Sequence, residues 1–191
     1  MKIDILDALS MRPMFTIHAG EYLVGLHIQQ KLGLNVWIPA KDAGIDLLVT
    51  DRENRRTVSV QAKYGKDFLP WESAALRESL RCLSWFTLNR TKLKESQAEF
   101  WVFVLHSFKG KPDFVVVPKA ELHQRMTKLH GADKTLQIYF CTTGSKRCWE
   151  IRGLSHDLSQ IEEGVRNEPL RDFTQYLNAN GWAALTKRLT S

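Results

Sequence analysis

Residues 44–63, GIDLLVTDRENRRTVSVQAK, decide the fold because they hold two apolar runs joined by a short charged segment. Runs rich in valine, isoleucine and threonine are typical of strands, and the polar segment DRENRR suits a hairpin loop. The sequence therefore predicts strands over 45–50 and 57–63. Their polar residues need an explanation: an acid stands near the start of the first strand, and a glutamine and a lysine end the second.

Side chains alternate between the two faces of a strand, so Asp46 shares a face with Leu48, and Gln61 shares a face with Lys63. Hairpin pairing would bring Asp46 beside Gln61 and Lys63. A carboxylate, an amide oxygen and an ammonium would then meet at one end of two strands, with the backbone carbonyl of Ala62 beside them.

A second acid fits the same place. A helix is predicted over residues 17–32, with Gly33 where a C-terminal glycine should stand. Glu21 lies in register with the apolar stripe of this helix, at the edge of the face that should pack on the sheet. Glutamate is rarely buried unless it is paired or binds a metal.

The rest of the chain predicts an α/β or α+β sheet flanked by helices, in one domain over residues 1–191 with a core at about 15–118 and an extension at about 119–191. Residues 100–105 are nearly all apolar, as expected of a central strand covered on both faces. The other expected elements are strand 35–38, helix 71–88, strand 113–118, helix 119–129, a hairpin of 136–141 with 147–152, and a helical tail over 170–189 interrupted at Asn180-Gly181.

Hard oxygen ligands of this kind suit Mg²⁺, which usually binds through one or two carboxylates plus water and phosphate oxygens. Such an ion can stabilise charge on a phosphodiester and lower the pKa of a bound water. Lys63 could orient that water or stabilise the developing negative charge. The residues thus supply the parts needed for metal-dependent phosphodiester hydrolysis.

The order of these residues resembles the PD-(D/E)xK nuclease superfamily. Glu21 on the first helix, Gly44-Ile-Asp46, and Gln61-Ala-Lys63 closing the next strand are most similar to its Mrr-type restriction endonuclease branch, where glutamine likewise replaces the second acid. The resemblance covers about residues 15–65 and implies a restriction-endonuclease-like αβββαβ core with a central mixed sheet, C-terminal α/β additions, and Mg²⁺-dependent DNA cleavage. Mn²⁺ is expected to substitute for Mg²⁺.

The resemblance also implies a role for each residue. Asp46 would be the principal metal ligand, Gln61 a secondary ligand beside the Ala62 carbonyl, Lys63 the catalytic lysine, and Glu21 the acid that completes the site. Two departures from the broader family pattern stand out. Isoleucine rather than proline precedes Asp46, and Gln61 leaves one fewer negative charge on the metal.

Structural roles compete with these assignments. Asp46 could bond a turn amide, and Glu21 could be a first-turn acid favoured by the helix dipole. Lys63 could extend its ammonium from the strand end to water, and Gln61 could satisfy backbone groups in a core. Trp85 is expected in the core rather than as a platform for nucleic-acid bases.

A formal charge of +6 suits a polyanionic partner, here DNA and more readily its double-stranded form. Phosphate contacts would make binding salt-dependent, although charges on a helix are usually its solvated face. Arg77 and Arg81, one helical turn apart, would share a face of the predicted helix. The candidate DNA-binding residues are Lys66, Arg77, Arg81, Lys109 and Lys111.

Composition bounds the cellular setting. No apolar run approaches the roughly 20 residues that span a bilayer, and the acidic N-terminus does not read as a signal peptide. Three cysteines, an odd number, favour a reducing, cytoplasmic compartment over a disulfide framework. Cys141, Cys148 and His156 superficially suggest zinc, but their spacing matches no standard ligand set, and burial of the thiols is expected.

The function expected from the sequence is that of a Mg²⁺-dependent endonuclease in restriction, defence or DNA repair. A homodimer is expected, because cutting two strands is easier with two sites. The alternatives are a nuclease-fold protein that binds DNA without cutting it, and a protein-interaction module that uses the fold as a scaffold.

Overall fold

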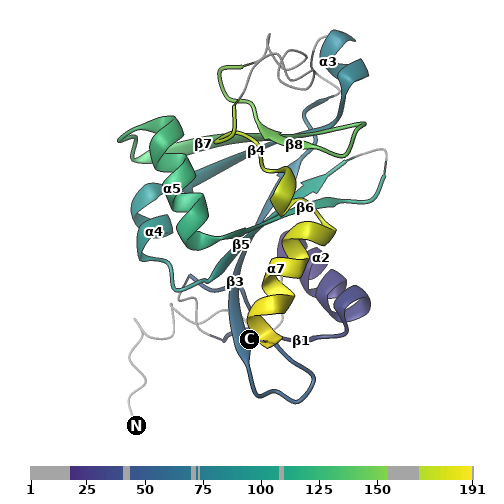
Figure 1. The fold of residues 1–191 in the computed structure, drawn as a ribbon, viewed down its shortest axis with the longest axis vertical. Helices are drawn as coiled ribbons and strands as arrows, with labels where there is room; N and C mark the ends of the chain where they lie inside the picture. Colours follow the sequence, from purple (N-terminus) through teal and green to yellow (C-terminus); the bar gives the residue numbers. More distant parts are fainter. Residues whose placement is uncertain are drawn as a thin grey trace.

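Two sheets organise the chain in the computed structural model, which describes residues 18–40, 44–69, 72, 74–107, 110–154 and 168–190 (Figure 1). The larger, mixed sheet has the strand order β1-β2-β3-β5-β6, and the smaller has the order β4-β7-β8. The strands of the larger sheet are β1 (Asn35–Trp37), β2 (Leu47–Thr50), β3 (Thr57–Lys66), β5 (Phe100–His106) and β6 (Asp113–Pro118), and those of the smaller are β4 (Leu80–Asn89), β7 (Thr135–Thr143) and β8 (Cys148–Glu150).

Helices lie around both sheets. They are α2 (Ala19–His27) with its π-helical continuation η1 (Ile28–Leu32), α3 (Ala74–Ser79), α4 (Arg90–Glu95), α5 (Lys119–His130), the short 3-10 turn η3 (Thr174–Tyr176) and α7 (Ala179–Thr190). Figure 1 shows α2 and α7 beside each other, and His27 of α2 stacks on Trp182 of α7. In the part of the chain that the structure describes, no helix has the length and apolarity required to span a membrane.

The hairpin at the start of the sheet is confirmed. β2 and β3 pair antiparallel from Leu47 with Val60 to Thr50 with Thr57, around the predicted polar loop. The first strand begins at Leu47 rather than at residue 45, yet the Asp46 N–H still donates to the Val60 carbonyl at 2.9 Å. Asp46 therefore stands just before β2, next to the middle of β3, which continues to Lys66.

The predicted central strand is also confirmed. β5 lies between β3, to which it is parallel, and β6, to which it is antiparallel. Its residues are buried except for a half-buried His106 at the end. The first helix ends at Gly33 as expected, in the left-handed conformation (φ +66°) that glycine adopts without strain.

The helix expected over 71–88 is wrong. Only Ala74–Ser79 is helical, and Leu80–Asn89 forms β4, which pairs with β7 along its length. A register shift between Leu80 and Cys82 places Leu80 and Leu83 in the same buried cluster, so a bulged strand reproduces the spacing of a helix face. Pairing with a strand far along the chain overrides the local helical pattern.

The interruption expected at Asn180-Gly181 is wrong as well. α7 begins at Ala179 and runs through both residues. A Cβ at Gly181 would lie 2.2 Å from the Tyr176 carbonyl oxygen, so glycine allows close packing at this point rather than ending the helix. The predicted helix over 119–129 and the late hairpin are confirmed as α5 and the pair β7–β8.

The two sheets pack closely at Gly65 of β3. A Cβ on Gly65 would lie 2.7 Å from the Phe86 ring of β4, so only glycine lets the smaller sheet approach this strand. A core cluster between the sheets includes Phe86, Phe103 and Phe140, and α5 adds Leu122 to it. A second cluster lies on the opposite face of the larger sheet, beneath α2 and α7. The smaller sheet consequently stands next to the end of β3 that carries Lys63.

Candidate active site

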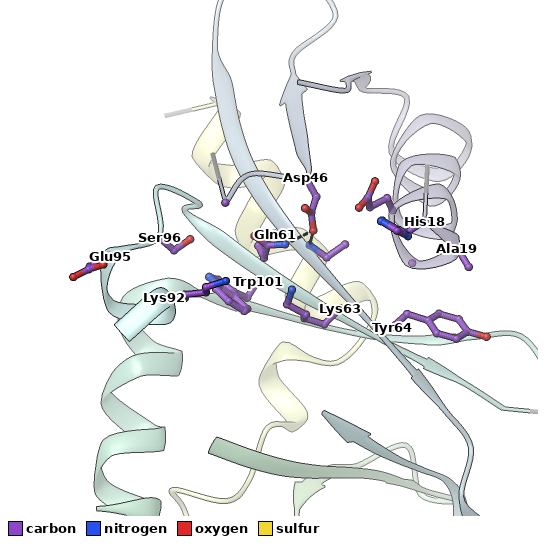
Figure 2. A pocket seen from close by; sticks show the side chains of 14 residues that line it. His18, Ala19, Asp46, Gln61, Lys63, Tyr64, Lys92, Glu95, Ser96 and Trp101 are labelled. Carbon is purple, nitrogen blue, oxygen red and sulfur yellow. Dashed lines mark hydrogen bonds between the residues drawn. The ribbon is translucent and has the colours of Figure 1, made fainter. Parts of the chain in front are cut away.

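A cavity of about 840 Å³ opens where α2, the start of β2 and the second half of β3 meet (Figure 2). Its lining includes each residue that the sequence nominated for catalysis or metal binding: Glu21, Asp46, Gln61, Ala62 and Lys63. Residues that are up to 42 positions apart in the sequence thus share one cavity, as the strand and helix registers predict.

Asp46 is the centre of the polar contacts in this cavity. The side chain is 3% exposed, and its Oδ2 accepts hydrogen bonds from the Gln61 side-chain amide and, at 2.8 Å, from the Ala62 N–H. In Figure 2, Asp46 and Lys63 approach Gln61 from opposite sides. A buried carboxylate needs such donors, because desolvation penalises its charge.

Glu21 reaches the cavity from the first turn of α2. It is 4% exposed, while Val24 and Ile28 of the same helix side enter the core beneath α2. The helix comes close to β3 at Gly20, where a Cβ would lie 3.0 Å from the Tyr64 Cβ. The predicted position at the edge of the packed face is therefore confirmed, and it places a second carboxylate at the cavity.

Lys63 is half-buried beside an aromatic ring. Its Nζ lies 5.5 Å from the ring centroid of Trp101, whose strand position pairs with Gln61. Trp101 is itself buried and lines the same cavity. A cation held over an indole face is electrostatically favourable and has fewer orientations to sample. The ring thereby helps to hold the ammonium at the cavity.

Sequence reasoning did not assign the wall opposite α2 to the site. Lys92 and Glu95 of α4, and Ser96 after it, line the cavity together with Trp101. The Asn89 side chain caps α4 by accepting from the Lys92 N–H at 2.9 Å. Asparagine before a run of helix formers is a recognised start signal. This start signal was missed because the preceding segment, 71–88, was wrongly expected to be a helix.

The predicted DNA-binding residues lie elsewhere. Lys66 is exposed on the opposite face of β3 from Lys63, and Lys111 is exposed before β6. Arg77 donates to the Glu72 carbonyl at 2.9 Å, whereas Arg81 forms a 2.5 Å ion pair with Asp113.

Arg81 belongs to β4, so the expectation that it shares a helix face with Arg77 is wrong. Lys109 lies outside the described residues. None of the four described residues, Lys66, Arg77, Arg81 or Lys111, lines the cavity that holds Lys63.

The donor set was compared with what a Mg²⁺ ion requires. No group of three or more His, Cys, Asp or Glu side chains among the described residues is arranged to hold a metal. The cavity has the buried carboxylates of Glu21 and Asp46, apart from the exposed Glu95 on the opposite wall, and Mg²⁺ commonly uses one or two carboxylates with water and phosphate for the rest. Backbone groups alternate sides along a strand, so the Ala62 carbonyl is directed to the same side as its N–H, toward Asp46.

Gln61 is oriented as a donor. Its Nε2 points at the Asp46 carboxylate, so the amide would have to turn to offer its oxygen to an ion. With that rotation the residues fit a hard divalent cation, through two carboxylates, an amide oxygen and a backbone carbonyl. Such a site has fewer negative charges than one built on three acids.

The cysteines are part of the core. Cys82, Cys141 and Cys148 are buried and form no disulfide bond, and His156 lies outside the described residues. Burial raises the pKa of the Cys82 thiol to about 12, and burial followed by the neighbouring Cys141 raises that of Cys148 well above its ordinary value. Protonated, enclosed thiols are poor metal ligands, which agrees with the burial expected for them.

Comparisons with protein-family models, with curated proteins and with solved structures gave no match for this chain. The assignment of a function therefore depends on the residues of the cavity.

Proposed function

We propose that this protein is a metal-dependent nuclease with a restriction-endonuclease-like core. The observation that carries the proposal is the shared cavity of Asp46, Gln61, Lys63 and Glu21, in which the Asp46 carboxylate contacts both Gln61 and the Ala62 backbone. Two buried carboxylates beside a half-buried lysine are costly to place together without a function that uses them.

The order of elements supports the same fold. A helix, an antiparallel hairpin and a strand parallel to its second arm follow one another as α2, β2, β3 and β5. The connection from β3 to β5 consists of α3, β4 and α4 rather than a single long helix. This departure leaves the position of the site on β2, β3 and α2 unchanged.

Each residue has a distinct task in the proposed reaction. Glu21, Asp46, the Gln61 amide oxygen and the Ala62 carbonyl would hold a Mg²⁺ ion. When bound, that ion would neutralise phosphate charge and lower the pKa of a coordinated water. Lys63 would donate to a phosphate oxygen, or to the attacking water, as negative charge develops. Water adds its hydroxyl to phosphorus, the P–O ester bond breaks, and the leaving oxygen takes the proton.

Plasmid cleavage tests the proposal. Supercoiled DNA incubated with the protein and Mg²⁺ or Mn²⁺ should be nicked or linearised, and EDTA should stop the reaction. Lys63→Ala should lower the rate by about 100-fold or more, the usual scale of a positioned proton donor or charge stabiliser. Lys128→Ala is the control, because it removes an exposed lysine of α5 that lies outside the cavity.

Equal rates for Lys63→Ala and Lys128→Ala would contradict the proposal, as would no cleavage of any DNA form with either metal. A second function, DNA binding without cutting, is favoured by one observation: Gln61 supplies an uncharged amide to the cavity where a further acid would add negative charge for the ion. DNA affinity that survives Asp46→Asn without any cleavage would support that second function. The expected homodimer can be checked by light scattering on the same samples.

A further inference from the structure

Three aromatic side chains meet at the outer face of the smaller sheet; Phe68 and Trp85 are exposed, and Tyr139 is half-buried. Alternation along β4 turns Phe86 and Leu88 toward the core and Trp85 outward. Trp85 is 42% exposed, and its ring centroid lies 6.2 Å from that of Tyr139 on β7 and 6.1 Å from that of Phe68. These three side chains, Phe68, Trp85 and Tyr139, form the aromatic platform.

The platform corrects the expectation that Trp85 lies in the core. A large aromatic side chain that stays exposed in contact with two others is unusual on a surface without a partner. In β4 the alternation is clear, because exposed Trp85, Thr87 and Asn89 are separated by buried Phe86 and Leu88. The face is therefore a regular feature of the strand rather than a single misplaced ring.

A groove connects this face to the candidate active site. A second cavity of about 350 Å³ is lined by Thr87 and Asn89, which follow Trp85 on the outer face of β4, and by Thr135 of β7. Its remaining wall includes Lys63 and Lys92, which also line the large cavity. Four residues of extended strand separate Trp85 from Asn89, roughly 13 Å. Thr87, which lines this groove, is thus the next residue after Trp85 on the same face of β4.

The charge of the groove indicates its occupant. The described residues that line it comprise two lysines, a tryptophan, a leucine and three neutral polar residues, with no carboxylate among them. Phosphates would be attracted to Lys63 and Lys92, and the hydroxyl and amide groups could bond sugar or phosphate oxygens. Aromatic rings beside a cationic groove are the means by which proteins hold unpaired strands, since each base has a face that can stack.

We propose that the aromatic platform and the adjoining groove bind an unpaired nucleic-acid strand and lead it to the cavity of Lys63. This inference rests on the proposed nuclease function and adds a substrate class, namely single-stranded nucleic acid or the unpaired part of a larger one. A continuous duplex is a poorer ligand, because its base faces are already stacked within the helix.

Binding measured in EDTA tests the platform without requiring cleavage. The wild-type protein should bind fluorescein-labelled oligodeoxythymidine or oligouridine more tightly than a duplex of the same length, and affinity should fall as salt rises. Trp85→Ala should weaken single-strand binding by roughly 5- to 100-fold, the cost of losing one base stack, and change duplex binding less. The relative affinity for the two oligonucleotides distinguishes DNA from RNA.

Three further variants, one test and two controls, keep the experiment decisive. Thr87→Glu places a negative charge on the groove at an exposed position, so it should fold and weaken single-strand binding even if Trp85→Ala does not fold. Thr57→Glu is the matched control, since Thr57 is an exposed strand threonine at the opposite end of β3. Trp37→Ala controls for loss of an exposed tryptophan elsewhere.

Unchanged single-strand affinity in Thr87→Glu and in folded Trp85→Ala would overturn the platform, as would preference for the duplex. Platform-dependent binding without any cleavage by the wild-type protein would overturn the nuclease proposal alone. Lys63-dependent cleavage with binding insensitive to Trp85 and Thr87 would overturn the platform alone.

Discussion

The larger sheet and the smaller sheet differ in how far apart in the sequence their paired strands lie. β2 and β3 are neighbours in sequence, and their pairing is specified by apolar alternation around a polar loop of six residues. β4 pairs instead with β7, where Leu88 meets Leu136 across 48 positions, and its own segment imitates a helix. Local pairing leaves a readable pattern, whereas distant pairing depends on a partner that the segment itself does not reveal.

The comparison extends to the functional surface. The larger sheet contributes Asp46, Gln61 and Lys63, polar residues that are conspicuous in apolar strands. The smaller sheet contributes Trp85 and Tyr139, aromatic residues that are unremarkable in sequence and whose exposure depends on which way β4 faces. The candidate catalytic residues could therefore be predicted from the sequence, whereas the proposed substrate-binding surface could not.

The largest expected effect on the relation between the two sheets comes from Gly65→Ala. The new methyl group would meet the Phe86 ring at 2.7 Å, so β4 and β3 would have to separate. Overpacking of this kind costs about 1–3 kcal/mol of stability, measurable by urea unfolding. Gly110→Ala is the control, because its methyl group would meet no atom within 4 Å. Equal stability of the two variants would show that the sheets are not packed through this contact.

Gln61→Glu tests the site on the larger sheet, because it should lower stability without divalent ions and increase the stabilisation that Mn²⁺ provides. Without divalent ions the variant loses the amide donated to Asp46 and sets two carboxylates side by side, so stability should fall by about 1–3 kcal/mol. With Mn²⁺ the added charge should bind the ion more tightly. The rise in melting temperature on adding Mn²⁺ should therefore be larger for the variant than for the wild-type protein. A loss that Mn²⁺ does not reverse would exclude Gln61 from the ion's surroundings.

These residues also show what could be predicted. The cavity of Glu21, Asp46, Gln61 and Lys63 was predictable because helical and strand periodicities fix which side chains share a face. Lys92 and Trp101 were not assigned, since their place depends on how the chain returns from β4 through α4 to β5. The orientation of the Gln61 amide has no trace in the sequence at all.

The smallest expected effect lies away from both surfaces, at His27. Burial, followed by the charge of Lys31, lowers the pKa of His27 below its ordinary 6.5, and the ring stacks on Trp182 and makes a tilted contact with Phe114. The unfolded chain then binds a proton more readily than the folded one as pH falls. This contribution to stability is complete above pH 6.5 and is lost as pH falls toward the lowered pKa.

His27→Phe keeps a ring in the stack and should remove that pH dependence. Urea unfolding from pH 7.5 downward should show a stability difference between variant and wild type that is constant above pH 6.5 and shifts in favour of the variant below it. A difference independent of pH over the whole range would contradict the assignment to His27.

Titration of Mn²⁺ into the wild-type protein and Asp46→Asn, followed by calorimetry, tests the central claim most directly. Asparagine keeps an oxygen that can accept from the Ala62 N–H, so the variant should fold while losing the carboxylate charge. The account predicts saturable binding to the wild-type protein that weakens at least tenfold in Asp46→Asn. No binding, or equal binding to both proteins, would contradict a metal site at Asp46.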